Sequence, residues 1–101
     1  MKTKHLIREK FRTDIFRRDG NRCKVCKKTE SIVAHHITDR NEIPNGGYVV
    51  ENGITLCPDC HMMAEEYHIS RGTRWFHTYL PDELYALIGE SRYSAFKAAK
   101  K

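Results

Sequence analysis

Residues 57–68 read CPDCHMMAEEYH and combine two cysteines, three positions apart, with a histidine directly after the second. The helix-forming residues that follow predict a helix from His61 to Ile69, so that Cys60 and His61 stand where it begins. Adjacent side chains on a helix diverge by about 100°. Cys60 and His61 can therefore serve two different sites from one turn of the chain.

A second pair of cysteines, Cys23 and Cys26, has the same C-x2-C spacing and ends thirty residues before Cys57. Paired C-x2-C motifs are typical of tetrahedral zinc sites, in which four thiolates meet at one ion. Two disulfides are the alternative, but the charged start of the chain lacks the apolar core of a secretory signal. We predict a structural Zn²⁺ at Cys23, Cys26, Cys57 and Cys60.

The composition describes a small, basic protein. The chain has 101 residues, a hydrophobic fraction of 40% and a formal net charge of +5. No apolar run approaches the roughly 20 residues that span a membrane, so we expect a soluble, cytoplasmic protein without membrane contacts. A chain of this size buries a small core, to which a structural zinc adds on the order of 10–16 kcal/mol of apparent binding free energy. The positive charge favours a polyanionic partner.

The hydrophobic pattern predicts two strands and a helix in the middle of the chain. Residues 31–37, SIVAHHI, and residues 53–57, GITLC, are rich in β-branched and apolar side chains. The stretch between them is dense in Asn, Gly and Pro and reads as a loop. The predicted order is strand, loop, strand, helix, and the fold class is α+β.

Helices are also predicted at both ends. Residues 6–18 carry an apolar stripe at helical spacing, and Asp19-Gly20 ends it. In the extension over residues 73–101, Trp75 and Phe76 are expected in the core, and a helix begins at Pro81. We therefore predict one domain over residues 1–101, with a core over residues 16–68.

The histidines and one asparagine follow the order His35-His36, Asn52, His61. Together with RDGNRCKVC at 18–26, AHHI at 34–37 and ENGITLCPDCH at 51–61, they give the chain from about Phe16 to His68 a pattern that resembles the HNH endonuclease family. The resemblance implies a ββα-metal module, two strands and a helix around one catalytic metal. It also implies a stand-alone nuclease of the phage or mobile-element type, in the host cytoplasm if phage-encoded.

The resemblance implies a role for each matching residue. His36 corresponds to the general base and Asn52 to an orienting residue that fixes the loop or the ring of His36. His35, where many members have an aspartate, and His61 correspond to ligands of the catalytic metal. The four cysteines correspond to the zinc knuckle that many members carry.

The catalytic metal is a divalent ion of open identity. Two imidazoles make the site softer than a carboxylate site, which favours Zn²⁺, Ni²⁺, Co²⁺ or Mn²⁺ over Mg²⁺. Glu65 and His68 lie four and seven residues after His61, broadly on the same helical face. Each is either a further metal ligand or part of an exposed polar face.

The leading function is a metal-dependent endonuclease that hydrolyses DNA phosphodiester bonds. A neutral imidazole can take the proton of the attacking water near pH 7, which suits His36. The alternatives are a non-catalytic zinc-ribbon module for DNA binding or adaptor contacts, which leaves the histidines and Asn52 without a role, and thiol redox chemistry, which a closed zinc site prevents. Basic residues around the first cysteine pair could follow DNA phosphates: Arg17, Arg18, Arg22, Lys24, Lys27 and Lys28.

Overall fold

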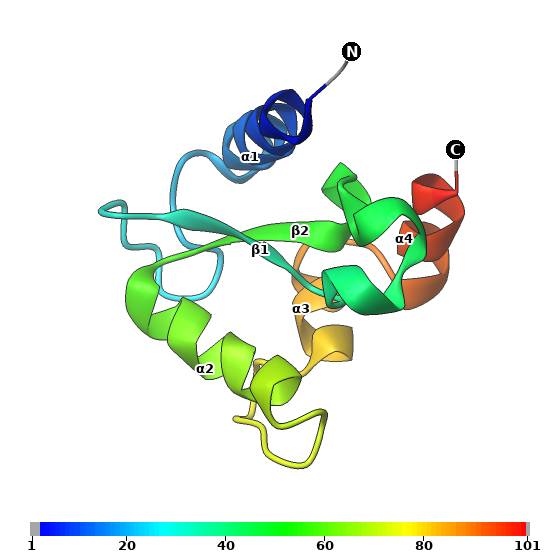
Figure 1. Cartoon of the computed structure of the whole chain (residues 1–101). Helices are drawn as coiled ribbons and strands as arrows, with labels where there is room; N and C mark the ends of the chain where they lie inside the picture. Colours follow the sequence, from blue (N-terminus) through cyan, green and yellow to red (C-terminus); the bar gives the residue numbers. More distant parts are fainter. Residues whose placement is uncertain (1–2, 101) are drawn as a thin grey trace.

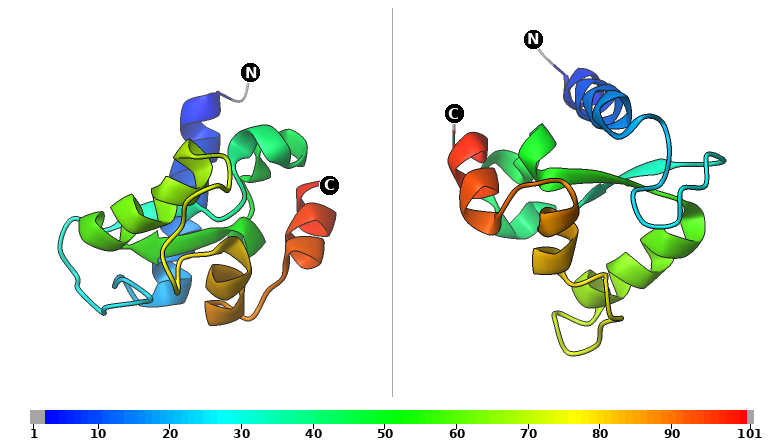
Figure 2. Two further views of the ribbon diagram at one scale, coloured as in Figure 1. Left: turned by 90° about the horizontal axis from the view of Figure 1, so that it is seen from below. Right: turned by 180° about the vertical axis from the view of Figure 1, so that it is seen from behind.

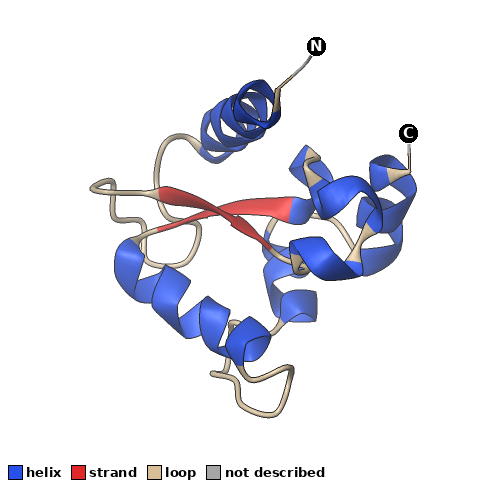
Figure 3. Cartoon of the chain, in the orientation of Figure 1, coloured by secondary structure: helices blue, strands red, loops and turns tan. Residues whose placement is uncertain are grey.

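The computed structural model describes residues 3–100, and the predicted α+β fold is confirmed. At its centre, β1 (Val33–His36) and β2 (Gly53–Leu56) form an antiparallel two-stranded sheet (Figure 3). His35 pairs with Ile54 and His36 pairs with Gly53. This register places the two adjacent histidines at the last positions of β1.

Four helices surround this sheet: α1 (Lys4–Asp19), α2 (Pro58–Ile69), α3 (Pro81–Leu87) and α4 (Arg92–Ala99). Helices α1 and α2 cover opposite faces of the strands, as Figures 1 and 2 show from two sides. The sheet is therefore sandwiched, and each face of β1 looks toward a different helix.

Helix α1 ends where the sequence predicts. Gly20 adopts a left-handed conformation with φ of 73°, and its N–H donates to the Arg17 carbonyl, a common helix end. The Asp19 carboxylate, nearly buried, then accepts a hydrogen bond of 2.9 Å from the Thr55 backbone N–H. Arg18 donates to that carboxylate and to the Gly53 carbonyl. Arg18 thus holds α1 against β2 rather than facing DNA, which corrects its expected place in the basic cluster.

Close packing of α1 on the sheet depends on a glycine in β2. A Cβ atom at position 53 would overlap the side chain of Ile15, which is fully buried. Gly53 therefore lets the helix approach the strand until Ile15 and Phe11 contact its backbone. A larger residue there would push α1 off the sheet.

The connection between β1 and β2 is a series of short 3₁₀ turns over Arg40–Glu42, Pro44–Gly47 and Val50–Asn52. Figure 2 shows α4 beside these turns, and Asn45 donates to the Ala99 carbonyl. The C-terminal extension thus supports the loop that follows His36.

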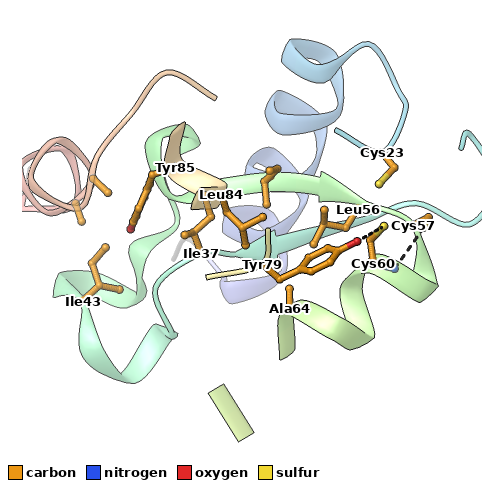
Figure 4. Packing of buried hydrophobic residues seen from close by; sticks show 13 residues of the cluster. Cys23, Ile37, Ile43, Leu56, Cys57, Cys60, Ala64, Tyr79, Leu84 and Tyr85 are labelled. Carbon is orange, nitrogen blue, oxygen red and sulfur yellow. Dashed lines mark hydrogen bonds between the residues drawn. The ribbon is translucent and has the colours of Figure 1, made fainter. Parts of the chain in front are cut away.

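The core lies between β2, α2 and the C-terminal helices (Figure 4). Its largest fully buried side chains include Ile37, Ile54, Leu56, Leu84 and Tyr85. The expectation that Trp75 and Phe76 belong to it is wrong, because they are 53% and 46% exposed.

The outer limits of the predicted domain, residues 1–2 and 101, lie outside the described part of the chain. The C-terminal helix predicted from Pro81 is divided at Gly89, since α3 ends before it and α4 begins after it. Over residues 3–100, none of the helices has the length and apolar character needed to cross a membrane.

Candidate metal centres and active site

The four cysteines converge from two parts of the chain, residues 23–26 and 57–60. Their sulfur atoms all lie within 4.8 Å of one another, and none is in a disulfide. Four thiolates bound tetrahedrally at about 2.3 Å place their sulfurs about 3.8 Å apart, so this cluster has the size that zinc requires. The cluster could hold zinc without a rearrangement of the backbone.

Backbone amides point at two of the four sulfur atoms, whereas the pKa values of Cys26 and Cys60 are raised in the absence of a metal. The Cys26 N–H points at Sγ of Cys23, and the Cys60 N–H points at Sγ of Cys57, at 3.5 and 3.4 Å. Burial disfavours a charged Cys23, but hydrogen bonds from backbone amides outweigh it and lower the pKa of this thiol to about 7. A thiol that ionises near neutral pH suits a metal ligand.

Cys60 has a further partner in the C-terminal extension. The Tyr79 hydroxyl donates to Sγ of Cys60 at 3.1 Å, and both side chains are buried (Figure 4). A hydrogen bond to a metal-binding sulfur orients it and tunes its charge. Tyr79 thus ties the extension to the cysteine cluster.

A second group of potential ligands lies between β1 and α2. One ligand atom each from His35, His61 and Glu65 lies within 4.8 Å of the other two. The Glu65 carboxylate is 3.3 Å from Nδ1 of His35 and 3.2 Å from Nε2 of His61. The structure therefore brings together the two predicted histidine ligands and the carboxylate that the sequence left open.

The protonation states of this group match those of metal ligands. Contact with His35 is the main cause that lowers the pKa of Glu65 to about 2, so the carboxylate is ionised. Burial lowers the pKa of His35, which keeps this imidazole neutral. Nδ1 of His35 is buried without a well-directed hydrogen bond. A buried nitrogen without a partner costs about 1–3 kcal/mol, and a bound cation would remove that cost.

His36 lies on the other face of β1. Its ring stacks on Phe11 of α1 with centroids 4.5 Å apart and meets the edge of Tyr48 at 4.8 Å. Burial is the main cause that lowers the pKa of His36 to about 4, and the positive charge of Arg40 adds to it. The ring is therefore neutral, and able to accept a proton, throughout the physiological pH range.

A strand normally directs adjacent side chains to opposite faces, so His35 and His36 are not expected to share a cleft. They do so here because β1 ends at His36. A cavity of about 390 Å³ opens at this end and is lined by both histidines and by His61, Glu65 and Arg40. A phosphate in this cavity would contact the ligand group and the His36 side chain together.

Asn52 is fully buried, and its amide uses its full hydrogen-bonding capacity. Oδ1 accepts from the Thr38 N–H at 2.9 Å and from the Tyr85 hydroxyl at 2.7 Å. Nδ2 donates to the carbonyls of Thr38 and Gly47. Asn52 thus fixes the backbone two residues after His36 and makes no hydrogen bond to its ring.

His68 is outside the ligand group but next to it. It stacks on His35 with centroids 5.3 Å apart, and its Nε2 donates to the His36 carbonyl at 3.1 Å. That hydrogen bond holds the end of β1 against the last turn of α2. In this geometry, His68 positions the end of β1.

Tyr85 completes the support of Asn52 and leads to a stability prediction. Its hydroxyl is buried and lies 2.6 Å from Oγ1 of Thr38. Tyr85→Phe should lower the free energy of unfolding by about 1–3 kcal/mol, because a buried hydroxyl of Thr38 loses its partner. Thermal unfolding followed by circular dichroism measures this, and Tyr93→Phe, at a 75% exposed position, is the matched control. Equal melting temperatures for the two variants would contradict the assigned role of Tyr85.

Comparison with known proteins agrees with this geometry. Residues 23–66 match the family model described as HNH endonuclease. This match spans the first cysteine pair, both strands and most of α2, and it contains the two ligand clusters. The chain matches no curated protein and no solved structure. Residues 23–66, a little under half of the chain, thus match the HNH endonuclease model, and the four clustered cysteines within them are consistent with a zinc knuckle.

Proposed function

We propose that the chain is a metal-dependent endonuclease that hydrolyses DNA phosphodiester bonds. The observation that carries this proposal is the single cavity at the end of β1, which is lined by a neutral imidazole, His36, and by the group of His35, His61 and Glu65. A base and a metal-ligand group that face one cavity are the two requirements for hydrolysis of a phosphodiester by an activated water.

His36 is the proposed general base. Its side chain borders the cavity and is uncharged near pH 7, so one ring nitrogen can accept a proton from a water beside the phosphate. Stacking on Phe11 and the edge of Tyr48 fix the ring plane, and the His68 and Asn52 contacts fix the backbone at His36 and at Thr38. A base held in one orientation loses little entropy when it reacts.

His35, His61 and Glu65 are the proposed ligands of the catalytic cation. The two neutral imidazoles and the ionised carboxylate favour Zn²⁺, Ni²⁺, Co²⁺ or Mn²⁺ over Mg²⁺. When bound there, a divalent metal supplies a Lewis acid for the charge that develops on the phosphate and its leaving oxygen. Cys23, Cys26, Cys57 and Cys60 are the proposed ligands of a separate structural Zn²⁺.

Two further expectations belong to this proposal. A single domain over residues 1–101 is supported by the contacts of Tyr79 and Tyr85, which join the C-terminal extension to the cysteine cluster and to Asn52. Cytoplasmic residence and the phage or mobile-element context stay predictions from the sequence, as do any protein partners.

A plasmid-nicking assay across Mg²⁺, Mn²⁺, Co²⁺, Ni²⁺ and Zn²⁺ tests the proposal. The parent should convert supercoiled DNA to nicked or linear forms with at least one of these metals. His61→Ala and Glu65→Gln should raise the metal concentration for half-maximal rate by roughly 10- to 100-fold, because each removes a ligand. Met62→Ala, at an exposed position on the same helix, is the control and should match the parent.

Metal analysis separates the two sites in these variants. Each variant should keep about one tightly bound zinc per chain at the cysteines. A parent that binds DNA but cleaves none with any metal would favour the non-catalytic zinc-ribbon function. If the metal dependence of His61→Ala and Glu65→Gln equals that of the parent, the proposed ligand set is wrong.

A further inference from the structure

A row of arginines lies beside the proposed active site, and two of them, Arg8 and Arg12, stand outside the segment that matches the HNH model. Arg8 and Arg12 are exposed and one turn apart on α1, about 6 Å along the helix axis. Arg40 comes from the turn after β1 and lies on the same side of the molecule, since Arg8, Arg12 and Arg40 line one hollow of about 390 Å³. Residues 32 positions apart in sequence thus contribute to one surface.

This hollow joins the cavity of the active site on one side. The two share Ala34, His36 and Arg40 as walls. On its other side it adjoins a second hollow, of about 410 Å³, with which it shares Arg8, Arg40 and Tyr48 and which Lys4 also lines. We call the two hollows around Tyr48 the arginine groove. It leads from His36 along α1 toward Lys4.

The charge of the arginine groove has one sign. Its walls contain Lys4, Arg8, Arg12 and Arg40, and none of the described residues that line it is acidic. Within residues 3–100, neither Arg8, Arg12 nor Arg40 forms an ion pair with a carboxylate. By contrast, Lys10 and Arg17 of the same helix both pair with Asp14. The unpaired arginines therefore gather on the face next to His36.

The positive charge of the groove affects the hydroxyl group of Tyr48, which lies at its centre. Arg40 donates to its hydroxyl at 3.1 Å. Burial disfavours ionisation of Tyr48, but hydrogen bonds and positive charge from Arg40 and Arg8 outweigh this and lower the pKa of its hydroxyl. The guanidinium groups of Arg8 and Arg40 thus both lie near the Tyr48 hydroxyl, and an anion bound there would contact both.

We propose that Arg8, Arg12 and Arg40 bind successive phosphates of the DNA strand that runs from the cleavage point over His36 and along α1. This inference rests on the proposed function for the position of the scissile phosphate. Guanidinium groups bind phosphate oxygens through paired hydrogen bonds, and contacts to the backbone carry no base sequence information. The groove therefore holds the strand in register with His36 and makes binding strongly dependent on salt.

The test measures binding of a fluorescein-labelled 20-base-pair duplex by anisotropy between 50 and 200 mM salt. The full chain carries His36→Ala so that the DNA stays intact. Arg8→Gln with Arg12→Gln should weaken binding by roughly tenfold or more at 100 mM salt and lower the slope of log affinity against log salt by about 1.8, or 0.9 per lost phosphate contact. Arg40→Gln alone should weaken binding by roughly five- to tenfold.

The matched control is Lys10→Gln with Lys97→Gln, which removes the same charge from two exposed positions that do not line the groove. It should change the affinity by less than about threefold, because these charges are exposed and screened at this salt concentration. Equal losses in the two double variants would overturn the groove and leave the nuclease proposal standing. Tight binding through the arginines by a parent that cuts no plasmid would overturn the nuclease proposal and leave the groove. A parent that neither binds nor cuts DNA would overturn both.

Discussion

Removal of the metal from the four-cysteine cluster is expected to unfold most of the chain rather than only to slow a reaction. Structural zinc contributes on the order of 10–16 kcal/mol of apparent binding free energy, whereas a whole domain has a net stability of about 5–15 kcal/mol. Cys23, Cys57 and Cys60 belong to the same buried cluster as Leu56 and Tyr79. Loss of the ion would remove the bonds that tie the loop of Cys23 and Cys26 to the start of α2.

Chelation under reducing conditions tests this expectation. The untreated protein should contain about one tightly bound zinc per chain, and chelated protein should lose its helical signal in circular dichroism and its cooperative melting transition. Cys57→Ser should have a similar effect without a chelator. Addition of Zn²⁺, but not Mg²⁺, should restore the fold of the chelated parent, which controls for irreversible damage. A reduced, zinc-free protein that melts within a few degrees of the parent would show that the cluster is not a structural metal site.

The order of the central elements was predictable because each carries a local signal. The β-branched run before His35 and the run before Cys57 give the two strands, and the Asn- and Gly-rich stretch between them gives the connection. The start of α2 was less predictable. This helix begins at Pro58, three residues before the predicted His61, because proline suits the first helical position and Sγ of Cys57 accepts the Cys60 N–H.

The function of the C-terminal extension was not predictable from local patterns. No local motif marks Tyr79 or Tyr85, yet their hydroxyls contact Cys60 and Asn52, 19 and 33 residues away. Trp75 and Phe76 had the composition of core residues but lie outside it. Which aromatic side chains are buried depends on how the extension folds back over β2, and no short-range spacing contains that information.

The candidate site was also predictable only in part. His35, His36, Asn52 and His61 were identified from their order in the sequence, through resemblance to a family. The place of Glu65 was left open because i, i+4 spacing to His61 fits an exposed helical face as well as a ligand. The arginine groove was not predictable, because it joins α1 to a turn after β1, and arginines 32 positions apart form no cluster in the sequence.

His36→Ala is expected to lower the rate of DNA cleavage by something like 10²- to 10⁴-fold at saturating metal, the usual contribution of a general base. DNA binding and the metal concentration for half-maximal rate should stay near those of the parent, since His36 lies outside the ligand group. A plasmid-nicking time course with each variant measures the rate, and metal titration measures the second quantity.

Packing complicates the alanine variant, because the His36 ring stacks on Phe11 and contacts Tyr48. His36→Gln keeps more of the volume but supplies no group that takes a proton near neutral pH. Both variants should therefore be inactive, while His36→Gln melts closer to the parent. Activity that follows melting temperature across the two variants, instead of being lost in both, would assign His36 a structural role.

The pH profile supplies a signature that loss of packing cannot imitate. Burial, with a smaller effect of the Arg40 charge, lowers the pKa of His36 from 6.5 to about 4, so the ring takes up a second proton only in acid. At saturating metal, the parental rate should be level from about pH 6 upward and should fall toward half near pH 4. The free energy of unfolding should also decline as the pH falls from 6.5 to about 4. In this range His36 binds a second proton in the unfolded chain but not in the folded protein. Melting curves at each pH separate the two effects, and His36→Gln should lose less stability over that interval. A parental rate that is half-maximal near pH 6.5 while the protein stays folded would place the base on another residue.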